Sequence, residues 1–459
     1  MIVFGGDGAD SIVNAGYRST INAGDGANKI NGGKDIDSIN NSAGNAVISS
    51  GNGNDKIINS GSGASINAGA GNNSVKSSAD RVSIVAGSGA DTITSNSYAT
   101  VNSGAGDDVI TVLDGVVNAG NGNNKITAKY LYAYHGLDVT LGSGNNTVNV
   151  NSIVGGGTVY VTGGNGDNKI IVKGNTSAHT QGVTLGSGDD YISLPGYNNT
   201  VSASAGNNTI YAGRYSTTVN AGAGDDYLIT SGNSNINIGS GRNYISLTSS
   251  SAGSSTITAG NGSDRIYIAS AKNSRGHFID ARAGNNYINS EIFGTVSTAT
   301  GNDTIIVNAG SSINAGAGNN FITVKGSASS NTILSSNGND FVSVGSSQTM
   351  NYINVGGGNN TVRSAGGTLL SGKGNDSIVA QGDSDYKIIN VGNGANYVSI
   401  YGGYNNTVIS GSGNDTIRAG TQSTRTGNNL IYVGAGNNYV NNSTITNSTV
   451  SRTAGRGGW

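Results

Sequence analysis

The sequence places an aspartate or an asparagine at the same point of a glycine-rich motif many times along the chain. In GSGDDYISL, which begins at Gly186, the fifth residue is Asp190, and in SAGNNTIYA, which begins at Ser204, it is Asn208. Carboxylate, amide and backbone carbonyl oxygens are the ligands that Ca²⁺ prefers in proteins. Side-by-side carboxylates can also serve acid–base chemistry. The chemistry of this sequence therefore depends on what surrounds the repeated acid.

The acidic copies of this position are the candidate metal ligands. They are Asp55, Asp91, Asp108, Asp190, Asp226, Asp264, Asp303, Asp340, Asp376 and Asp415. From Asp190 onward the acid alternates with asparagine at Asn208, Asn243, Asn286, Asn320, Asn360, Asn396 and Asn438. Asp91 and Asp108 occupy consecutive copies, which makes this pair the strongest candidate for a single cation site.

Catalysis is a weaker interpretation of the same residues. In an extended strand, neighbours such as Asp107 and Asp108 point to opposite faces, so the two carboxylates cannot readily cooperate. The three histidines, His135, His179 and His277, fall in variable loops of different repeats, which does not favour a metal site or a hydrolytic triad. The segment RGHFID, residues 275–280, combines several chemistries, and we expect it to be a surface loop. The sequence predicts that the protein is not an enzyme.

The glycine-rich motif recurs as the corner of a repeat. Corners begin at Gly6, Gly24 and Gly51 and continue to Gly434, at spacings of roughly 16–23 residues, the size of one solenoid turn. The stretch between Gly33 and Gly51 is hard to register and suggests a degenerate turn near Ser42. A corner this tight needs positive φ and leaves little room for a side chain, which explains the glycines.

Two aliphatic anchors accompany each corner. One lies two residues after the Asp or Asn, as at Ile57, and the other lies three residues before the next corner, as at Ile66. Polar residues alternate with both anchors, the pattern of a strand with one buried face. We therefore expect an all-β protein, a single right-handed parallel β-solenoid with two short strands per turn. Residues 1–440 form the solenoid in this prediction, and 441–459 form a terminal tail or docking segment.

In such a fold the Asp and Asn side chains stack along one edge. Aspartates one turn apart would repel by about 1 kcal/mol per pair in water. A calcium ion between them is one remedy. Interleaved asparagine is another, because its amide can donate to the carboxylates above and below, and the resulting polar ladder would bind calcium loosely or not at all. The sequence leaves both alternatives open.

Several corners resemble a known calcium-binding repeat. The segments GNGNDKI (from Gly51), GSGADTI (from Gly87), GAGDDVI (from Gly104) and GSGNDTI (from Gly411) are similar to the hemolysin-type, or RTX, nonapeptide Gly-Gly-x-Gly-x-Asp-x-aliphatic-x. The resemblance implies a secreted bacterial protein whose parallel β-roll binds Ca²⁺ between stacked corners. This chain departs from the family in its frequent Asn and in corners that recur consistently on one edge.

The composition excludes several classes. The 459 residues include 77 glycines, one proline and no cysteine, with a net charge of −2. The absence of cysteine excludes disulfides and thiolate sites, and the small charge argues against nucleic acid as a partner. No apolar run is long enough to insert in a membrane as a helix. We expect the chain to be part of a longer one or to be secreted through a signal outside it.

These observations favour a structural role at the cell surface or outside the cell. The expected forms are a rod, adhesin stalk, matrix component or head-to-tail filament subunit, with end-to-end self-association. The alternative is a repeat module of a secreted polysaccharide-binding or polysaccharide-modifying protein, in contact with glycans or a cell surface. Tyr287, Phe321 and Phe341 follow the ladder position and are expected to form an exposed partner-contact patch.

Overall fold

The fold consists of short parallel strands joined by corners and loops. The computed structural model describes residues 1–14, 16–132, 135–174, 180–213, 215–248, 253–269, 275–326, 329–345, 350–382, 384–420, 426–442 and 448–452. Every regular element among these residues is a β-strand. The predicted fold class, an all-β parallel solenoid, is confirmed.

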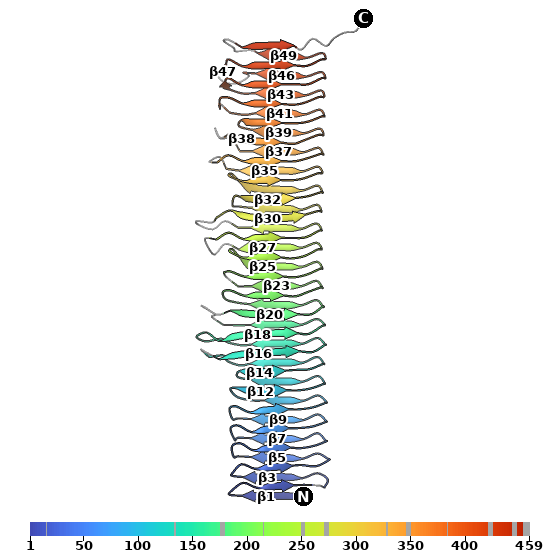
Figure 1. Ribbon diagram of the computed structural model, residues 1–459, viewed down its shortest axis with the longest axis vertical. Helices are drawn as coiled ribbons and strands as arrows, with labels where there is room; N and C mark the ends of the chain where they lie inside the picture. Colours follow the sequence, from blue (N-terminus) through green and yellow to red (C-terminus); the bar gives the residue numbers. More distant parts are fainter. Residues whose placement is uncertain are drawn as a thin grey trace. The chain divides into compact units, whose positions relative to one another are not determined.

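The chain divides into two compact units, Met1–Thr230 and Ser231–Trp459. Within each unit, a turn contributes one strand to a sheet that we call sheet A and the next strand to a sheet that we call sheet B (Figure 1). We call the passage from sheet B to sheet A the corner edge, and the passage from sheet A to sheet B the loop edge. The side chains between the two sheets form the core of each unit.

Unit 1 pairs each strand in parallel with the corresponding strand of the next turn, as β7 pairs with β9. Its sheet A contains β1 (Ile2–Gly6), β3 (Thr20–Gly24), β5 (Ser38–Asn41), β7 (Lys56–Asn59), β9 (Ser74–Ser77), β11 (Thr92–Thr94), β13 (Val109–Val112), β15 (Lys125–Ala128), β17 (Thr147–Val150), β19 (Lys169–Val172), β21 (Tyr191–Leu194), β23 (Thr209–Ala212) and β25 (Tyr227–Ser231). Its sheet B contains β2 (Ser11–Val13), β4 (Lys29–Asn31), β6 (Val47–Ser49), β8 (Ser65–Asn67), β10 (Ser83–Val85), β12 (Ala99–Asn102), β14 (Gly115–Asn118), β16 (Gly136–Leu141), β18 (Thr158–Gly163), β20 (Gln181–Leu185), β22 (Thr200–Ser202) and β24 (Thr218–Asn220).

Unit 2 repeats the same arrangement. Its sheet A contains β27 (Tyr244–Thr248), β29 (Arg265–Ile268), β31 (Tyr287–Ser290), β33 (Thr304–Asn308), β35 (Phe321–Lys325), β37 (Phe341–Val344), β39 (Thr361–Ser364), β41 (Ser377–Ala380), β43 (Tyr397–Ile400), β46 (Thr416–Ala419) and β49 (Tyr439–Asn442). Its sheet B contains β26 (Asn235–Asn237), β28 (Thr256–Thr258), β30 (His277–Arg282), β32 (Gly294–Thr298), β34 (Ser312–Asn314), β36 (Thr332–Leu334), β38 (Asn351–Asn354), β40 (Gly367–Leu370), β42 (Ile388–Asn390), β45 (Thr407–Ile409), β48 (Leu430–Val433) and β50 (Thr449–Arg452). The short strands β44 (Gly403–Tyr404) and β47 (Thr426–Gly427) pair at the loop edge.

The predicted aliphatic anchors fill the space between the sheets. Ile57 pairs in register with Val75 on sheet A, and Ile66 pairs with Ile84 on sheet B, and all four are buried. Their polar neighbours point outward, so a turn buries only a thin apolar face. Stacking covers that face on both sides in the interior turns, because each of them lies between two others.

The corner glycines are required by the close stacking of the backbone. Gly106 has φ +140°, and a Cβ placed on it would lie 2.0 Å from the carbonyl oxygen of Gly89 in the preceding turn. Both the conformation and the contact exclude an ordinary side chain. The prediction from the sequence is therefore correct for the corner edge.

The sequence-based register of the first corners is wrong. Gly24 ends β3 of sheet A and leads into β4 of sheet B, so it lies at the loop edge, and Gly6 lies there for the same reason. Gly51 instead follows β6 and leads into β7, at the corner edge. The segment around Ser42 belongs to the loop edge rather than to a degenerate turn. In these turns both edges have short glycine corners, so a single motif does not reveal its edge.

The end of the chain contributes a further strand. β50, in the segment assigned to a tail, pairs in parallel with β48. Its four residues are all exposed. The division into a solenoid and a tail at residue 440 remains a prediction. The described residues contain no helix that could cross a membrane.

Candidate functional site

The predicted Asp and Asn positions form a buried row at the corner edge, which we call the inner ladder. The backbone N–H of Asn73 donates to Oδ1 of Asp91 at 2.7 Å, and that of Asp91 donates to Oδ1 of Asp108 at 2.8 Å. The N–H of Asp108 donates in turn to Oδ1 of Asn124 at 3.0 Å. At the corner, where the sheet is interrupted, the side-chain Oδ1 of each turn thus accepts the backbone N–H of the preceding turn in place of a backbone carbonyl.

All ten predicted aspartates belong to this row and are buried. Asp37 belongs to it as well, because its N–H donates to Oδ1 of Asp55 at 2.7 Å. The sequence analysis missed Asp37 because it misread the register of the first turns. The inner ladder therefore contains two adjacent acidic pairs in unit 1, Asp37 with Asp55 and Asp91 with Asp108.

A second row, which we call the outer ladder, consists of the residues immediately before the inner ladder. Here the side chain accepts the N–H of the following turn: Oδ1 of Asn54 accepts from Asn72 at 2.8 Å, and Oδ1 of Asp107 accepts from Asn123 at 2.6 Å. The outer ladder is exposed, and its bonds run opposite to those of the inner ladder. Asp107 and Asp108 therefore belong to different rows, as the strand argument predicted.

Asparagine satisfies the inner position more completely than aspartate does. Nδ2 of Asn168 donates to the carbonyl oxygens of Gly164 and Gly166 in its own corner, at 3.2 and 2.6 Å. It also donates to Oδ1 of Asp190 in the next turn at 3.1 Å. The expectation that the amide donates in both directions is wrong. Toward the preceding turn the side chain accepts, because its Oδ1 faces the N–H of Asn146.

Aspartate leaves an oxygen where asparagine has its amide hydrogens. Within the described residues, Oδ2 is buried without a hydrogen-bond partner at Asp37, Asp55, Asp91, Asp108, Asp190, Asp303, Asp376 and Asp415. Since Asp and Asn have the same shape and the corner backbone repeats, we infer that this oxygen faces the corner carbonyls. An ionised carboxylate in such a place is costly without a counter-ion or a proton.

Burial accordingly perturbs these acids. It raises the pKa of Asp91 to about 6, with a further contribution from the charge of Asp108. It likewise raises the pKa of Asp190 to about 6 and that of Asp226 to about 7, against hydrogen bonds from the preceding asparagines that lower it. The residues five positions before these three aspartates are Ala86, Leu185 and Ala221, and none of them has a hydroxyl group.

Other acidic turns carry a hydroxyl residue five positions before the aspartate. Ser335 donates to Oδ2 of Asp340 at 2.8 Å. Burial raises the pKa of Asp340, and the hydroxyl of Ser335 works against that rise. Equivalent residues are Ser50, Ser103, Thr298, Ser371 and Ser410, and each precedes an aspartate.

No asparagine of the inner ladder has serine or threonine five residues before it; those turns carry Ala, Val, Leu, Ile or Gly there. Serine or threonine at this position therefore occurs only in turns whose inner-ladder residue is an aspartate. Direct donation is not the rule, because Ser50 and Ser103 donate to the backbone carbonyls of Ala68 and Ala119. Their hydroxyl dipoles nevertheless lower the pKa of the nearby Asp55 and Asp108 and offset part of the burial.

The donor set of an acidic corner suits a hard cation. Within the described residues, no three acidic or histidine side chains gather in one place, so a cation would take its remaining ligands from backbone carbonyls. Oδ2 of Asp91 or Asp108 and the carbonyls of the corner glycines are all oxygen donors, as Ca²⁺ requires. Asparagine turns place an amide group in the same space. The residues that would hold the ion are therefore the inner aspartates, and most readily an adjacent pair.

The expected aromatic patch is divided in two. Phe321 and Phe341 pair in register and stack with ring centroids 4.8 Å apart. Tyr287 is separated from Phe321 by Thr304 in the intervening strand. It packs against Tyr267 instead, with centroids 5.5 Å apart. A role in partner contact for the three residues remains a prediction.

The histidines differ from the expectation of isolated loop residues. His179 lies outside the described residues. His277 begins β30 and is buried, with its Nδ1 accepting the N–H of Ser255 at 2.8 Å. Burial lowers its pKa, and the hydrogen bond from Ser255 opposes that change. It is therefore part of the fold rather than of a surface loop.

His135 belongs to a cluster that the sequence analysis missed. Its Nδ1 lies 2.6 Å from Oδ2 of the buried Asp114, and its Nε2 lies 3.1 Å from the hydroxyl of Tyr98. Oδ1 of Asp114 accepts the N–H of Tyr98 at 2.6 Å, so the three residues form a closed ring of bonds across successive turns. Alignment of whole turns, rather than of motifs, is the signal that could have found it.

The loop edge of unit 2 carries a partial ladder of its own. The N–H of Lys387 donates to Oδ1 of Asn406 at 3.0 Å, and that of Asn406 donates to Oδ1 of Asn429 at 3.2 Å. Nζ of the buried Lys387 donates to the carbonyl of Ser384 at 2.6 Å. In the sequence, this ladder could have been found from the polar residue that stands two positions before each sheet B anchor. The loops of variable length between the copies obscured that pattern.

A family model describes the corners. The RTX calcium-binding nonapeptide repeat (4 copies) matches residues 4–39, 66–97, 184–214, 195–228, 203–236, 249–267, 323–347 and 400–440. The matched segments span both units and agree with the resemblance found in the sequence. No curated protein matches the chain. The matched model describes a calcium-binding repeat, and the match does not give a number of ions.

Proposed function

We propose that this protein, a divergent member of the RTX repeat family, is an extracellular structural protein whose stacked turns are held by the inner ladder and reinforced by Ca²⁺. The family supplies calcium-binding repeats, and the ladder supplies a bonding scheme that works in their asparagine turns without an ion. The role that fits both is a load-bearing spacer, stalk or filament subunit.

The observation that carries this proposal is the regularity of the inner ladder. One side-chain oxygen per turn accepts the N–H of the preceding turn in both units, as in Asn208 to Asp226 at 2.8 Å and Asn360 to Asp376 at 2.8 Å. Such a bond contributes about 0.5–1.5 kcal/mol where the acceptor is neutral and about 1.5–3 kcal/mol where it is an ionised carboxylate. Repetition of one stabilising device, rather than one exceptional turn, is typical of a structural element.

Calcium has a place in the acidic turns. Most inner aspartates lie between asparagines, so a corner offers one carboxylate rather than two. Fewer carboxylates lower the affinity for Ca²⁺ and suit the millimolar range of extracellular modules. This argument supports an extracellular location and predicts that Ca²⁺ adds stability to a chain that is already folded.

Self-association end to end forms the second part of the proposal. The first turn of unit 1 exposes Ile2, Phe4 and Val13. These side chains alternate with the inward-facing Val3 and Ile12, and a further turn would flank them and pair with β1, whether the same polypeptide or a second copy supplies it. An uncovered strand of this kind favours addition of another strand.

A thermal melt of the purified chain in EGTA and in Ca²⁺ tests the structural and calcium parts. We expect β-sheet circular dichroism in both buffers and a higher Tm in Ca²⁺. An unfolded chain in EGTA would refute the ladder as a sufficient scaffold, and equal Tm values would refute reinforcement by calcium.

Light scattering after size exclusion, with negative-stain microscopy of the same fractions, tests self-association. We expect assemblies that lengthen with protein concentration. Replacement of Phe4 by Lys should shorten them, and Tyr130→Lys, at another exposed aromatic of unit 1, is the matched control. A monodisperse monomer at high concentration would contradict this part alone.

A further inference from the structure

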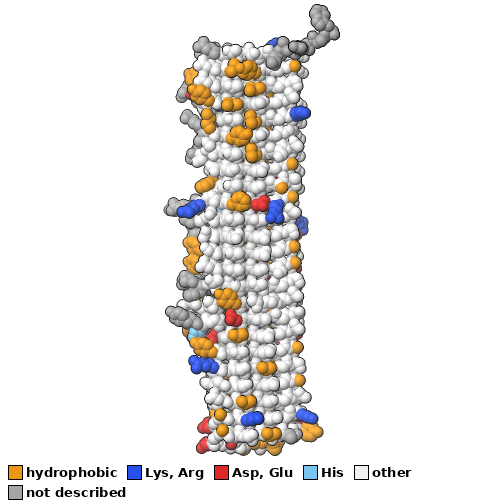
Figure 2. Space-filling model, in the orientation of Figure 1, with side chains coloured by type: hydrophobic (Ala, Val, Ile, Leu, Met, Phe, Trp, Pro, Cys, Tyr) orange, Lys and Arg blue, Asp and Glu red, His pale blue; other side chains and the backbone are white. Residues whose placement is uncertain are grey.

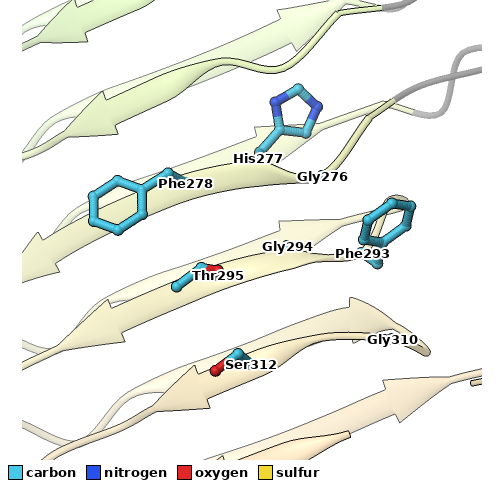
Figure 3. A pocket seen from close by; sticks show the side chains of 8 residues that line it. All are labelled: Gly276, His277, Phe278, Phe293, Gly294, Thr295, Gly310 and Ser312. Atoms are coloured by element: carbon cyan, nitrogen blue, oxygen red, sulfur yellow. The ribbon is translucent and has the colours of Figure 1, made fainter. Parts of the chain in front are cut away.

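The outer face of sheet B in unit 2 contains a small slot with aromatic walls. It has a volume of about 270 Å³ and lies over β30, β32 and β34 (Figure 3). Phe278 and Phe293 flank it, and Thr295 and Ser312 line it. We infer that this slot is a carbohydrate-binding site that takes one sugar ring of a polysaccharide. The inference stands independently of the proposed structural role.

Glycines create the slot. Gly276, Gly294 and Gly310 begin or precede three successive sheet B strands and leave the backbone bare at the loop edge. A Cβ on Gly276 would lie 2.8 Å from Cε2 of Phe293, so the ring packs directly against that backbone. The bare floor and the fixed ring give the slot a defined shape rather than that of a chance gap between flexible side chains.

The walls present aromatic surface to solvent. Phe278 is 47% exposed and Phe293 is 43% exposed, although both are large apolar residues. Phe278 pairs in register with Thr295, and Thr295 pairs with Ser312, so the three side chains form a column on the outer face. Within the described residues, the hydroxyls of Thr295 and Ser312 make no hydrogen bond to the protein.

The polar groups near the slot suit a hydroxylated ligand. Asp280 and Arg282 follow Phe278 on the same outer face of β30, with Nε of Arg282 lying 3.6 Å from Oδ2 of Asp280. Arg275 precedes the slot and is exposed. His277 also lines the slot, but its side chain is buried and its Nδ1 already accepts the N–H of Ser255. The slot itself thus combines an apolar wall with the hydroxyls of Thr295 and Ser312, the composition of small-ligand sites, and the charged groups lie outside its lining.

A sugar ring fits this combination better than a protein partner does. A pyranose has an apolar C–H face that can pack on a phenyl ring and hydroxyls that can bond to Thr295 and Ser312. A stable protein interface needs at least about 1,000 Å² with an apolar centre. The face shown in Figure 2 is mainly neither hydrophobic nor charged, and its hydrophobic groups are isolated over most of its height and gather only toward the C-terminal end.

The test is binding of the intact chain to a panel of glucan, mannan, chitin and alginate oligosaccharides, followed by calorimetric titration of those retained. The alginate arm separates acidic from neutral sugars, since Arg275 would favour the former. We expect Phe278→Ala and Phe293→Ala each to lower the affinity about tenfold or more, as for a central aromatic contact. Gly276→Ala should act in the same direction, because its Cβ displaces the ring of Phe293.

Phe321→Ala is the matched control. Phe321 is 45% exposed on sheet A of the same unit, away from the slot, and its loss should leave the affinity unchanged. Equal melting temperatures of the variants would exclude loss of fold as the cause. Absence of binding to every sugar would overturn the inference. Equal loss in the Phe321 variant, or retention of affinity in both slot variants, would overturn it as well.

Discussion

Replacement of Asp91 by asparagine tests the account of the inner ladder. In the wild-type protein, Oδ2 of Asp91 is buried without a hydrogen-bond partner, and Asp108 lies in the next turn. Asparagine keeps the Oδ1 that accepts from Asn73 and gains an amide that can donate to the corner carbonyls, as Asn168 does. In chelator at pH 7 we expect the variant to be more stable than the wild type.

The size of the effect follows from the pKa of Asp91. Burial raises it from 3.8 to about 6, so the folded state holds the proton more tightly than the unfolded state does. The stabilisation that this proton provides is fully present below about pH 3.8 and is lost as the pH rises through about 6. That gap corresponds to a loss on the order of 3 kcal/mol at pH 7, which the variant avoids.

Thermal unfolding between pH 4 and pH 8 in EGTA is the assay. For a unit of this size, 1 kcal/mol shifts Tm by about 2–4 °C, so a gain of several degrees is expected at pH 7 and little at pH 4. In Ca²⁺ the advantage should shrink or reverse, because the variant lacks a ligand. Asp340→Asn is the control; its Oδ2 already accepts from Ser335, so we expect little gain. A lower Tm for the Asp91 variant in EGTA at pH 7 would refute the reasoning.

Three further predictions concern the fold. Asn168→Ala removes three hydrogen bonds that its amide donates and two that its Oδ1 accepts from Asn146, and should lower the free energy of unfolding by about 2–4 kcal/mol. Asn145→Ala in the exposed outer ladder should cost less than about 1 kcal/mol, and denaturant titration compares the two variants. Gly106→Ala should disrupt its corner, while Gly6→Ala, whose Cβ meets nothing within 4 Å, should leave the melting temperature unchanged. His135→Ala breaks the ring of bonds at Asp114 and should speed proteolytic cleavage near residues 128–138 without a large change in Tm.

Much of the architecture is written in local patterns of the sequence. The alternation around Ile57 and Ile66 predicts two half-buried strands per turn, and the glycine corners predict tight stacking. These features depend on neighbouring residues in one turn, so they can be identified without the rest of the chain. The same reasoning found ten of the eleven described inner aspartates, all but Asp37, and separated Asp107 from Asp108.

What remained hidden depends on contacts between turns. The first corners look alike on both edges. Only the strand pairing shows that Gly24 lies at the loop edge and Gly51 at the corner edge. The direction in which Asn168 donates and the bond from Ser335 to Asp340 are set by how one corner lies on the next.

The sequence by itself determined the parallel solenoid and its repeated acid, because the strand alternation, the glycine corner and the Asp or Asn are local patterns that recur in each turn. The tertiary structure decided which oxygens are satisfied, and it brought His135 to Asp114 and placed the rings of Phe278 and Phe293 around one slot. Those residues lie 15 or more positions apart, and loops of variable length set their alignment. No local pattern records such an alignment, since it arises only when the turns are stacked.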